Sequence, residues 1–257
     1  MPFALITGAS KGIGKAIAQL LASRGFDLLL VARSSDLLQQ VAMEISHLSK
    51  RHCHILAIDL SESDAPGKVY EWCSKNHFDV SVLVNNAGYG LSGNFENYNV
   101  KEHADMLQVN VVTLVVLTRL FLPDLLKQKE AYILNIGSTA SYQAVPLLSA
   151  YAASKSFVLS FSRGLYQELK DTTVSVTCIC PGPTDTNFAN RANVGPKALK
   201  AAERFNMSPE TVARIAVESL FRNRPEVITG GINKLSVFFA WMLPKNVVEN
   251  IAKKLYD

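Results

Sequence analysis

Tyr151 and Lys155 stand four positions apart in the stretch SAYAASKSF, which covers residues 149–157. In a helix, side chains at positions i and i+4 share one face, with Cβ atoms about 5–6 Å apart. A free phenol has a pKa of about 10, and a neighbouring ammonium lowers that pKa because it favours the charged phenolate. The spacing therefore predicts general acid–base chemistry, in which Tyr151 exchanges a proton with a carbonyl or alcohol oxygen.

The elements that must position this pair follow from the apolar pattern, in which runs of strand length alternate with segments of helical period. The expected strands lie at 2–7, 26–32, 53–60, 79–88, 131–138, 174–182 and 226–231. The expected helices lie at 13–24, 35–49, 101–127, 151–170 and 209–222, with a last helix that ends near Leu255. Nearly continuous apolar strands are typical of a parallel sheet covered by helices on both faces.

We therefore expect one doubly wound α/β domain of Rossmann type, with three layers, over residues 1–257. Residues 1–186 would form the cofactor-binding and catalytic core. Residues 187–257 would form a substrate loop and C-terminal helices. No internal repeat or linker marks a second domain.

The stretch TGASKGIG connects the first expected strand to the first expected helix and contains Gly8, Gly12 and Gly14. Glycine lets a backbone approach a pyrophosphate closely, and a helix N-terminus offers unpaired N–H groups to it. The spacing differs from GxGxxG and lacks the GK[ST] of a P-loop, and glycines also serve ordinary strand-to-helix turns. The position between strand and helix favours a dinucleotide site.

The second strand indicates which dinucleotide is bound. An NAD site usually places Asp or Glu about 20 residues beyond the glycines, where it binds the ribose 2′-hydroxyl. Here Ala32 and Arg33 stand at that place, and Lys11 adds a cation within the glycine turn. A guanidinium pairs with phosphate in bidentate geometry. The sequence thus favours NADP(H) over NAD(H), the alternative being that both cations are simply solvated.

Six motifs resemble, in their order, those of the short-chain dehydrogenase/reductase family in its ordinary single-domain branch. They are TGASKGIG, NNAG at 85–88, Asn110 in QVNVV, Ser138 in NIGSTAS, YAASK at 151–155 and PGPTDT at 181–186. The resemblance covers residues 3–186. Thr113 departs from it at a position often held by glycine, and the segment between Ser138 and Tyr151 is individual to this chain.

The resemblance implies a cofactor site along these motifs. The three glycines would hold the pyrophosphate, Asp59 would contact the adenine, and Asn85 would fix the fourth strand and line the cleft. Thr184 and Thr186 would lie by the nicotinamide carboxamide or the phosphates. The implied cofactor-binding residues are Gly8, Ser10, Lys11, Gly12, Ile13, Gly14, Arg33, Asp59, Leu60, Asn85, Ala87, Gly88, Tyr151, Lys155, Pro181, Gly182, Thr184 and Thr186.

The resemblance also implies a catalytic set of Asn110, Ser138, Tyr151 and Lys155. Ser138 would bind the substrate oxygen, Lys155 would also hold the nicotinamide ribose, and Asn110 would hold a water that links the lysine to solvent. Each residue taken alone more often has a structural role. A serine such as Ser138 usually caps a helix, and an asparagine such as Asn110 can simply bond a backbone carbonyl. A Tyr–Lys pair is usually a packing tyrosine and a solvated lysine. Together they predict an NADP(H)-dependent ketone or aldehyde reductase, or the reverse secondary-alcohol dehydrogenase.

Two other functions stay open. A redox sensor or scaffold would bind NADP(H) without catalysis, although such relatives usually lose the tyrosine or the lysine. An enoyl reductase usually spaces these two residues farther apart. Candidates for the substrate pocket are Tyr89, Tyr142, Gln143, Leu147, Leu148, Phe188 and Phe205. Their apolar character predicts a neutral small-molecule carbonyl substrate, either small or fairly hydrophobic.

Composition and charge limit the other partners. The formal net charge of +4 is spread along the 257 residues, which argues against a nucleic-acid surface. The four cysteines show no metal-ligand spacing, so we expect no metal site, and reduced thiols suit a cytoplasmic protein. The N-terminus lacks the charged region of a signal peptide. The family habit of pairing through its fourth and fifth helices implies a homodimer or homotetramer.

The apolar run LSVFFAWML, from Leu235 to Leu243, is shorter than the ~20 residues that a membrane span requires. We expect a buried C-terminal helix or a subunit contact there. Peripheral membrane attachment is the lesser alternative.

Overall fold

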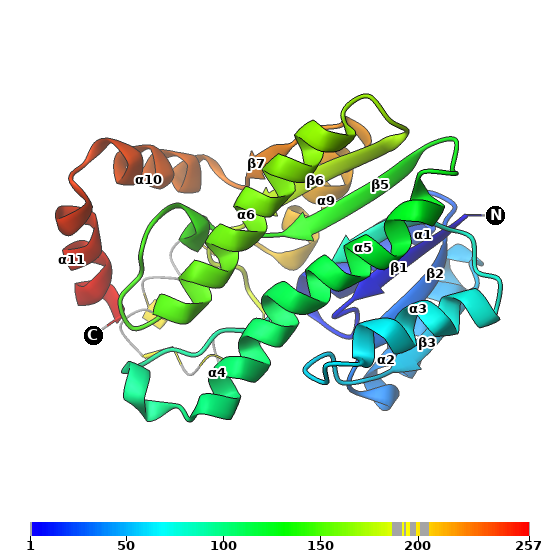
Figure 1. Cartoon of the computed structure of the whole chain (residues 1–257), viewed down its shortest axis with the longest axis horizontal. Coiled ribbons are helices and arrows are strands. Elements are labelled where there is room, and N and C mark those ends of the chain that lie inside the picture. The colour runs from blue at the N-terminus through cyan, green and yellow to red at the C-terminus, as the bar shows by residue number, and fades with distance from the viewer. Residues whose placement is uncertain (1, 187–191, 193, 196–198, 201–205, 257) are drawn as a thin grey trace.

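The computed structural model describes residues 2–186, 192, 194–195, 199–200 and 206–256. In this part of the chain, parallel strands form one seven-stranded sheet in the order β3-β2-β1-β4-β5-β6-β7 (Figure 1). The strands are β1 (Phe3–Thr7), β2 (Asp27–Ala32), β3 (Cys53–Ala57), β4 (Val80–Asn85), β5 (Ala131–Ile136), β6 (Val174–Cys180) and β7 (Glu226–Ile228). The prediction of a doubly wound parallel sheet is confirmed.

Helices cover both faces of this sheet, and the core lies in the two layers between them. One face carries α1 (Gly12–Ser23), α2 (Ser35–Ser49) and α9 (Pro209–Phe221), and the other carries α3 (Ala65–Lys75), α5 (Thr113–Leu125) and α6 (Ser149–Leu169). Successive strand residues point to opposite faces. Leu29 packs beneath α3 and α5, whereas Leu30 packs beneath α1 and α2, and both are fully buried. This two-sided burial explains the continuous apolar strands.

Three parts of the helical pattern differ from the expectation. The sequence does not reveal α3, because only Ala65, Pro66, Val69 and Cys73 of its residues are buried and the rest are polar or half-exposed. The expected 101–127 helix consists of α4 (Val100–Leu107), a π-helical turn η2 (Gln108–Val112) and α5. The last helix is two helices, α10 (Gly231–Met242) and α11 (Lys245–Tyr256), because Pro244 lacks the N–H that would continue α10.

Among the described residues, Val100–Leu125 is the one helical stretch long and apolar enough to cross a membrane by length and composition. It lies within the fold: Leu117 and Phe121 are buried in the layer that α5 forms with β4 and α3. Part of its apolar composition is therefore accounted for by the core.

Candidate active site

The expected site residues lie at the carboxyl edge of the sheet, because parallel strands all end at the same edge. They follow β1 (residues 8–14), β2 (Arg33), β3 (Asp59 and Leu60), β4 (Ala87 and Gly88), β5 (Ser138) and β6 (residues 181–186). Strand order reverses between β1 and β4, and ligands of open α/β sheets bind at such a switch point. The topology therefore brings the separate motifs together at one edge of the sheet, where a ligand crevice is expected.

The turn after β1 requires glycine at three positions for two reasons. Gly8 and Gly12 have φ angles of 67° and 53°, in the left-handed region that favours glycine. Gly14 is excluded from bearing a side chain, since its Cβ would stand 2.3 Å from the Gly8 carbonyl oxygen and 2.4 Å from Asn86 Nδ2. The backbone thus folds tightly back over the start of α1.

The N-terminus of α1 fits an anionic ligand. Lys11 is the N-cap, yet its side chain makes no capping hydrogen bond, and the first turn contains no acidic residue. Uncapped N–H groups and the positive end of the helix dipole favour a phosphate at this place. Ser10 and Ile13 are half-buried beside it. These residues fit the pyrophosphate of a dinucleotide.

Two residues that the sequence analysis did not single out hold this turn against β4. The Thr7 hydroxyl accepts hydrogen bonds from the Asn86 and Ala87 N–H groups at 3.0 and 3.1 Å and donates to the Val84 carbonyl oxygen. Asn86 Nδ2 donates to the carbonyl oxygens of Thr7 and Gly8. Both residues stand inside quoted motifs, TGASKGIG and NNAG, which is the signal that could have identified them.

Arg33 follows β2 and lies 3.6 Å from a carboxylate oxygen of Asp59, with both side chains substantially exposed. Partial burial opposes ionisation of Asp59, but hydrogen bonds from the Ser61 N–H and hydroxyl and the charge of Arg33 outweigh it. The pKa of the Asp59 carboxyl is therefore lowered. One cation and one anion thus stand together at the end of the β2–β3 pair. Leu60, beside them, is buried and accepts a hydrogen bond from the Thr113 hydroxyl through its carbonyl oxygen.

Asn85 is the last residue of β4. Its side chain is buried and donates to the Thr118 hydroxyl and to Asn135 Oδ1, its register partner on β5. The amide thus fixes β4 to β5 and α5, as expected, and its side chain lies within the helix–sheet layer. Of the residues that follow, Ala87 is bound through its N–H to the Thr7 hydroxyl, and Gly88 lies next to Asn110 and Lys155.

The Tyr151–Lys155 pair lies on the buried face of α6, with the Lys155 amine 5.9 Å from the centre of the Tyr151 ring. Burial lowers the pKa of Lys155 to about 8, against a smaller opposing effect of Cys178 and Cys180. The amine donates a hydrogen bond of 2.8 Å to the Ile136 carbonyl oxygen. An ammonium held in this way is the partner that an acidic phenol needs.

Asn110 reaches the same place from η2. Its side chain is 1% exposed, accepts from the Tyr89 N–H at 3.0 Å, and donates to the Tyr89 carbonyl oxygen and the Ser154 hydroxyl. A methyl group on Gly88 would stand 3.1 Å from Asn110 Oδ1 and 3.3 Å from the Lys155 amine. Gly88, Asn110 and Lys155 therefore converge. A π turn, often found at functional sites, aims the amide at this point.

Ser138 caps the short helix η3 (Thr139–Tyr142) at the end of β5, where its hydroxyl accepts from the Ala140 N–H at 3.1 Å. Ser141 binds it to α6: the Ser141 hydroxyl accepts from the Ser138 N–H at 3.3 Å and donates to the Lys155 carbonyl oxygen at 2.8 Å. Ser141 was not among the expected residues, and nothing in its sequence context distinguishes it.

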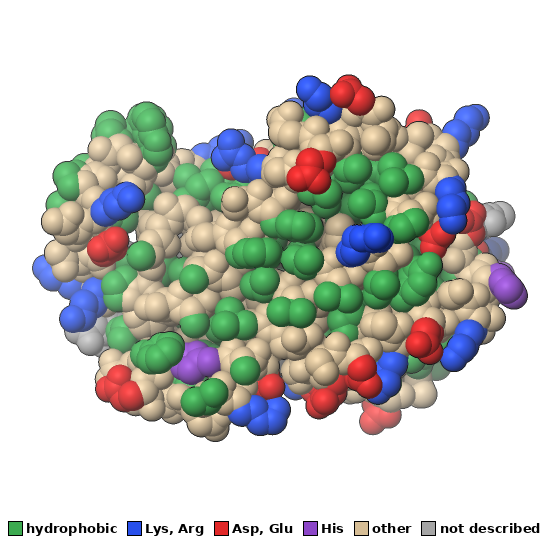
Figure 2. Space-filling model, viewed as in Figure 1, with side chains coloured by type: hydrophobic (Ala, Val, Ile, Leu, Met, Phe, Trp, Pro, Cys, Tyr) green, Lys and Arg blue, Asp and Glu red, His purple; other side chains and the backbone are tan. Residues whose placement is uncertain are grey.

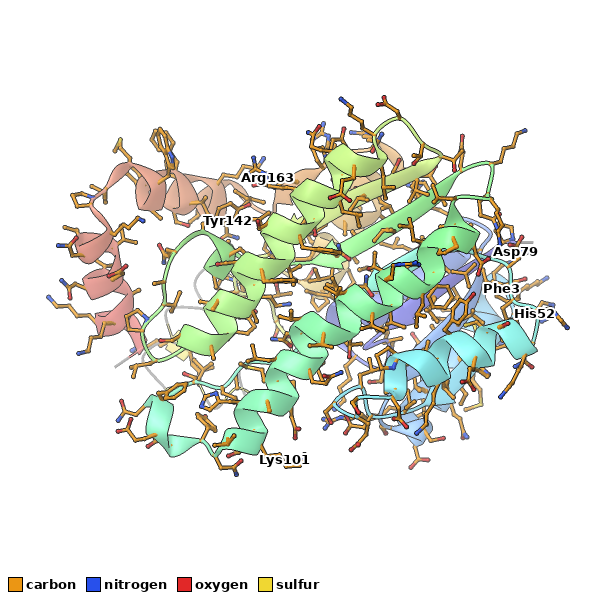
Figure 3. All side chains as sticks on the ribbon, in the orientation of Figure 1. Phe3, His52, Asp79, Lys101, Tyr142 and Arg163 are labelled. Carbon is orange, nitrogen blue, oxygen red and sulfur yellow. The ribbon has the colours of Figure 1, made fainter. Side chains whose placement is uncertain are left out.

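Some pocket candidates lie by Tyr151 and others do not. Leu148 and Tyr89 pack with Tyr151 in one apolar cluster. Tyr142 packs in a different cluster, and its hydroxyl donates to Glu226, which also pairs with Arg163. Figure 3 labels Tyr142 and Arg163, which lie close together in that view. Gln143 and Leu147 are half-buried in the segment before α6, whereas Phe188 and Phe205 lie outside the described residues.

The segment after β6 closes the other side of the site. A Cβ on Gly12 would stand 2.9 Å from the Thr186 methyl group, so this segment meets the glycine turn. Thr184 donates to the Gly182 carbonyl oxygen, and Pro181 accepts from the Thr139 N–H. In the described part of the chain, no group of three or more His, Cys, Asp or Glu side chains could hold a metal ion.

The family model for short chain dehydrogenases matches residues 2–196. The chain belongs to this family. Its members are oxidoreductases that act on CH–OH and C=O groups with a nicotinamide cofactor. The resemblance inferred from the six motifs is therefore confirmed at the level of the family.

Individual relatives agree on the family and differ in their ligands. A bovine (Bos taurus) very-long-chain 3-oxoacyl-CoA reductase is 33% identical over 85% of this chain and 68% of its own length. A Sphingobium yanoikuyae short-chain dehydrogenase solved with NADPH is 27% identical, has a TM-score of 0.82 and matches over 94% of each chain. A Burkholderia phymatum member solved with NAD shares the fold, with a TM-score of 0.83, 24% identity and coverage of 100% and 96% of the chains.

Proposed function

We propose that this oxidoreductase is an NADP(H)-dependent ketone or aldehyde reductase, or in reverse a secondary-alcohol dehydrogenase. The observation that carries the proposal is the buried Lys155 amine, which stands beside the Tyr151 ring and next to both Gly88 and Asn110. When bound, the nicotinamide cofactor supplies or accepts the hydride.

The chain's own residues then manage the proton and the oxygen. With a pKa of about 8, Lys155 is mostly protonated at neutral pH, and its charge favours the phenolate form of Tyr151. Tyr151 thus gives a proton to a carbonyl oxygen, or takes one from an alcohol. The Ser138 hydroxyl provides a hydrogen bond to the same oxygen, which orients the substrate. The Asn110 amide is bound through its oxygen to the Tyr89 N–H and through its nitrogen to the Ser154 hydroxyl. It thereby fixes the backbone next to Lys155.

The preference for NADP(H) is supported by charge. Arg33 and Lys11 are exposed cations at the two places that a ribose 2′-phosphate would approach, and Ala32 stands where an NAD site usually has a carboxylate. Asp59 is the one carboxylate of this group, and Arg33 already lies beside it. A guanidinium has five N–H donors, so Arg33 can pair with Asp59 and with a 2′-phosphate at the same time.

The substrate class is supported by the apolar cluster around Tyr151. Met106, Val145 and Leu148 are buried against it, with Tyr89 and Leu91 packed at its edge. Such walls suit a neutral, fairly hydrophobic carbonyl compound. The bovine relative acts, by its name, on 3-oxoacyl-CoA; a 3-oxoacyl thioester is accordingly one arm of a substrate screen.

We include an oligomer in this proposal, a homodimer or homotetramer formed through α5 and α6. Hydrophobic side chains follow these two helices across the middle of the face in Figure 2. Val112, Leu126 and Phe157 are 41–43% exposed there. A cytoplasmic location is likewise proposed; the four cysteines are all free, and three of them are buried.

The test is Tyr151→Phe. The variant keeps the ring and its packing and loses the hydroxyl, so kcat should fall by about 10²–10⁴ while NADPH binding, followed by its fluorescence, is unchanged. The screen covers aldehydes, ketones, 3-oxoacyl thioesters and secondary alcohols. Cofactor binding without turnover of any of these by the wild-type protein would instead favour a sensor or scaffold, and an active Tyr151→Phe variant would refute the catalytic assignment.

A further inference from the structure

In helix α10, apolar side chains face outward and a polar side chain faces inward, the opposite of an ordinary surface helix. Its one buried residue is a polar one, Asn233, while Phe238, Phe239 and Trp241 are 51%, 42% and 81% exposed. Of the two expected fates of the run 235–243, a buried helix is therefore wrong, and a subunit contact stays a prediction. The remaining large exposed side chains of this helix and its end are Ile232, Leu235, Met242 and Leu243.

The next helix extends this apolar surface. α11 turns Val248 and Ala252 inward, where Ala252 joins the apolar cluster that contains Tyr151. Its other side carries Val247 and Ile251, which are 45% and 60% exposed. Figure 2 shows hydrophobic side chains gathered over α10 at the upper left of the molecule, with lysine or arginine side chains beside them over α11. We call these exposed residues of α10 and α11 the C-terminal apolar face.

The charge around this face is mainly positive. Between Gly231 and Lys254 the chain carries four lysines, at 234, 245, 253 and 254, and one acid, Glu249. Lys234 also lines a surface hollow of about 200 Å³ with Arg222 and Arg224, where Glu218 is the acidic member and pairs with Arg214. Aromatic and aliphatic residues beside lysines are the composition of a helix that lies in a membrane interface.

A second copy of the chain matches this face less well. A twofold contact places the same surface against itself, so the lysines of both copies would gather around one interface with one glutamate each to pair them. The apolar band on α5 and α6 is a separate surface and already offers a place for pairing. An anionic lipid surface complements both the apolar residues and the lysines.

We propose that the C-terminal apolar face binds an anionic phospholipid membrane, with α10 lying in the plane of the interface. Phe238, Trp241 and their neighbours enter the boundary between headgroups and acyl chains. The lysines of α11 contact the headgroup phosphates. The attachment is peripheral, because α10 has 12 residues and a span requires ~20.

The experiment is flotation of the full-length protein with two kinds of vesicle, phosphatidylcholine alone and phosphatidylcholine with about a third phosphatidylglycerol. The wild-type protein should float with the anionic vesicles at low salt. Its partition should fall at least about tenfold with neutral vesicles or at high salt, because salt screens the lysines. The double variant Phe238→Glu, Trp241→Glu should stay in the unbound fraction with both kinds.

The matched control is Leu48→Glu, the same type of change at a residue of α2 that is 73% exposed. It should float like the wild type. NADPH fluorescence and circular dichroism confirm that both variants are folded, and because flotation needs no turnover, its result is independent of the proposed catalytic function. The proposal is overturned if the wild type does not float, if it binds neutral and anionic vesicles equally, or if Leu48→Glu loses as much binding. A lipid-free dimer that Phe238→Glu, Trp241→Glu converts to monomer would identify a second copy as the occupant and overturn it as well.

Discussion

The Lys155 amine donates a hydrogen bond of 2.8 Å to the carbonyl oxygen of Ile136, the last residue of β5. Ser138, two residues beyond Ile136, caps η3, and the Ser141 hydroxyl in η3 donates to the Lys155 carbonyl oxygen. The end of β5 and the middle of α6 are thus bound together on both sides of Ser138. The catalytic candidates Ser138 and Lys155, which come from two elements, are thus connected through a short series of hydrogen bonds.

The buried ammonium makes stability depend on pH. The pKa of Lys155 is lowered to about 8 in the folded protein, so between about pH 8 and 10.5 the unfolded chain binds more protons and stability rises with pH. From pH 7.5 to 9.5, the free energy of unfolding should rise by about 2 kcal/mol more in the wild type than in Lys155→Met. Urea denaturation of both proteins measures this difference. Parallel pH profiles would contradict it.

Ser141 should act as a positioning residue. Ser141→Ala removes the link between the Ser138 N–H and the Lys155 carbonyl oxygen, so kcat should fall about tenfold while the Kd for NADPH is unchanged. Ser141→Thr, which keeps the hydroxyl, should retain more of the activity. The control is Ser160→Ala, at an exposed position of the same α6. A drop in kcat and NADPH affinity together would indicate a merely structural role.

Gly14→Ala should disrupt the cofactor turn. The new methyl group would enter the space of the Gly8 carbonyl oxygen and Asn86 Nδ2, so we expect a loss of about 1–3 kcal/mol of stability and weaker NADPH binding. Gly67→Ala is the control, because nothing lies within 4 Å of its Cβ; stability there should be unchanged or rise by up to ~1 kcal/mol. Thermal unfolding and fluorescence titration distinguish the two variants.

Arg33 should determine the preference between cofactors. Arg33→Ala removes one charge-assisted contact to a 2′-phosphate, so the KM for NADPH should rise about 10- to 100-fold while the KM for NADH changes little. Lys129→Ala, at an exposed position after α5, should leave both values as they are. The same change in KM for the two cofactors would show that Arg33 does not contact the 2′-phosphate.

The predictable part of the site is the part that depends on local geometry. The left-handed φ of Gly8 and Gly12 and the one-turn spacing of Tyr151 and Lys155 are properties of short segments, and a sequence displays them directly. The parallel sheet is likewise evident, since strands covered on both faces must be apolar throughout. The structure brings these motifs to one edge as the strand order requires.

The unpredicted part depends on partners from distant segments. The direction of Tyr142 depends on Glu226, on a strand that comes much later, and the place of Asn85 depends on Thr118 and Asn135. The helix α3 has few buried residues, so its period is weak. The exposed run on α10 has the composition of a core segment, and its apolar residues face outward because Asn233 faces inward.

The inward-facing Asn233 amide also connects α10 to the segment after β6. Asn233 fills the space directly above Gly182, where an added Cβ would stand 2.3–2.5 Å from its side chain, and its Nδ2 is bound to the Thr229 carbonyl oxygen. The backbone that leads to Thr184 therefore packs directly against the helix that carries Trp241. Any displacement of α10 would therefore have to be accommodated by the segment that follows β6.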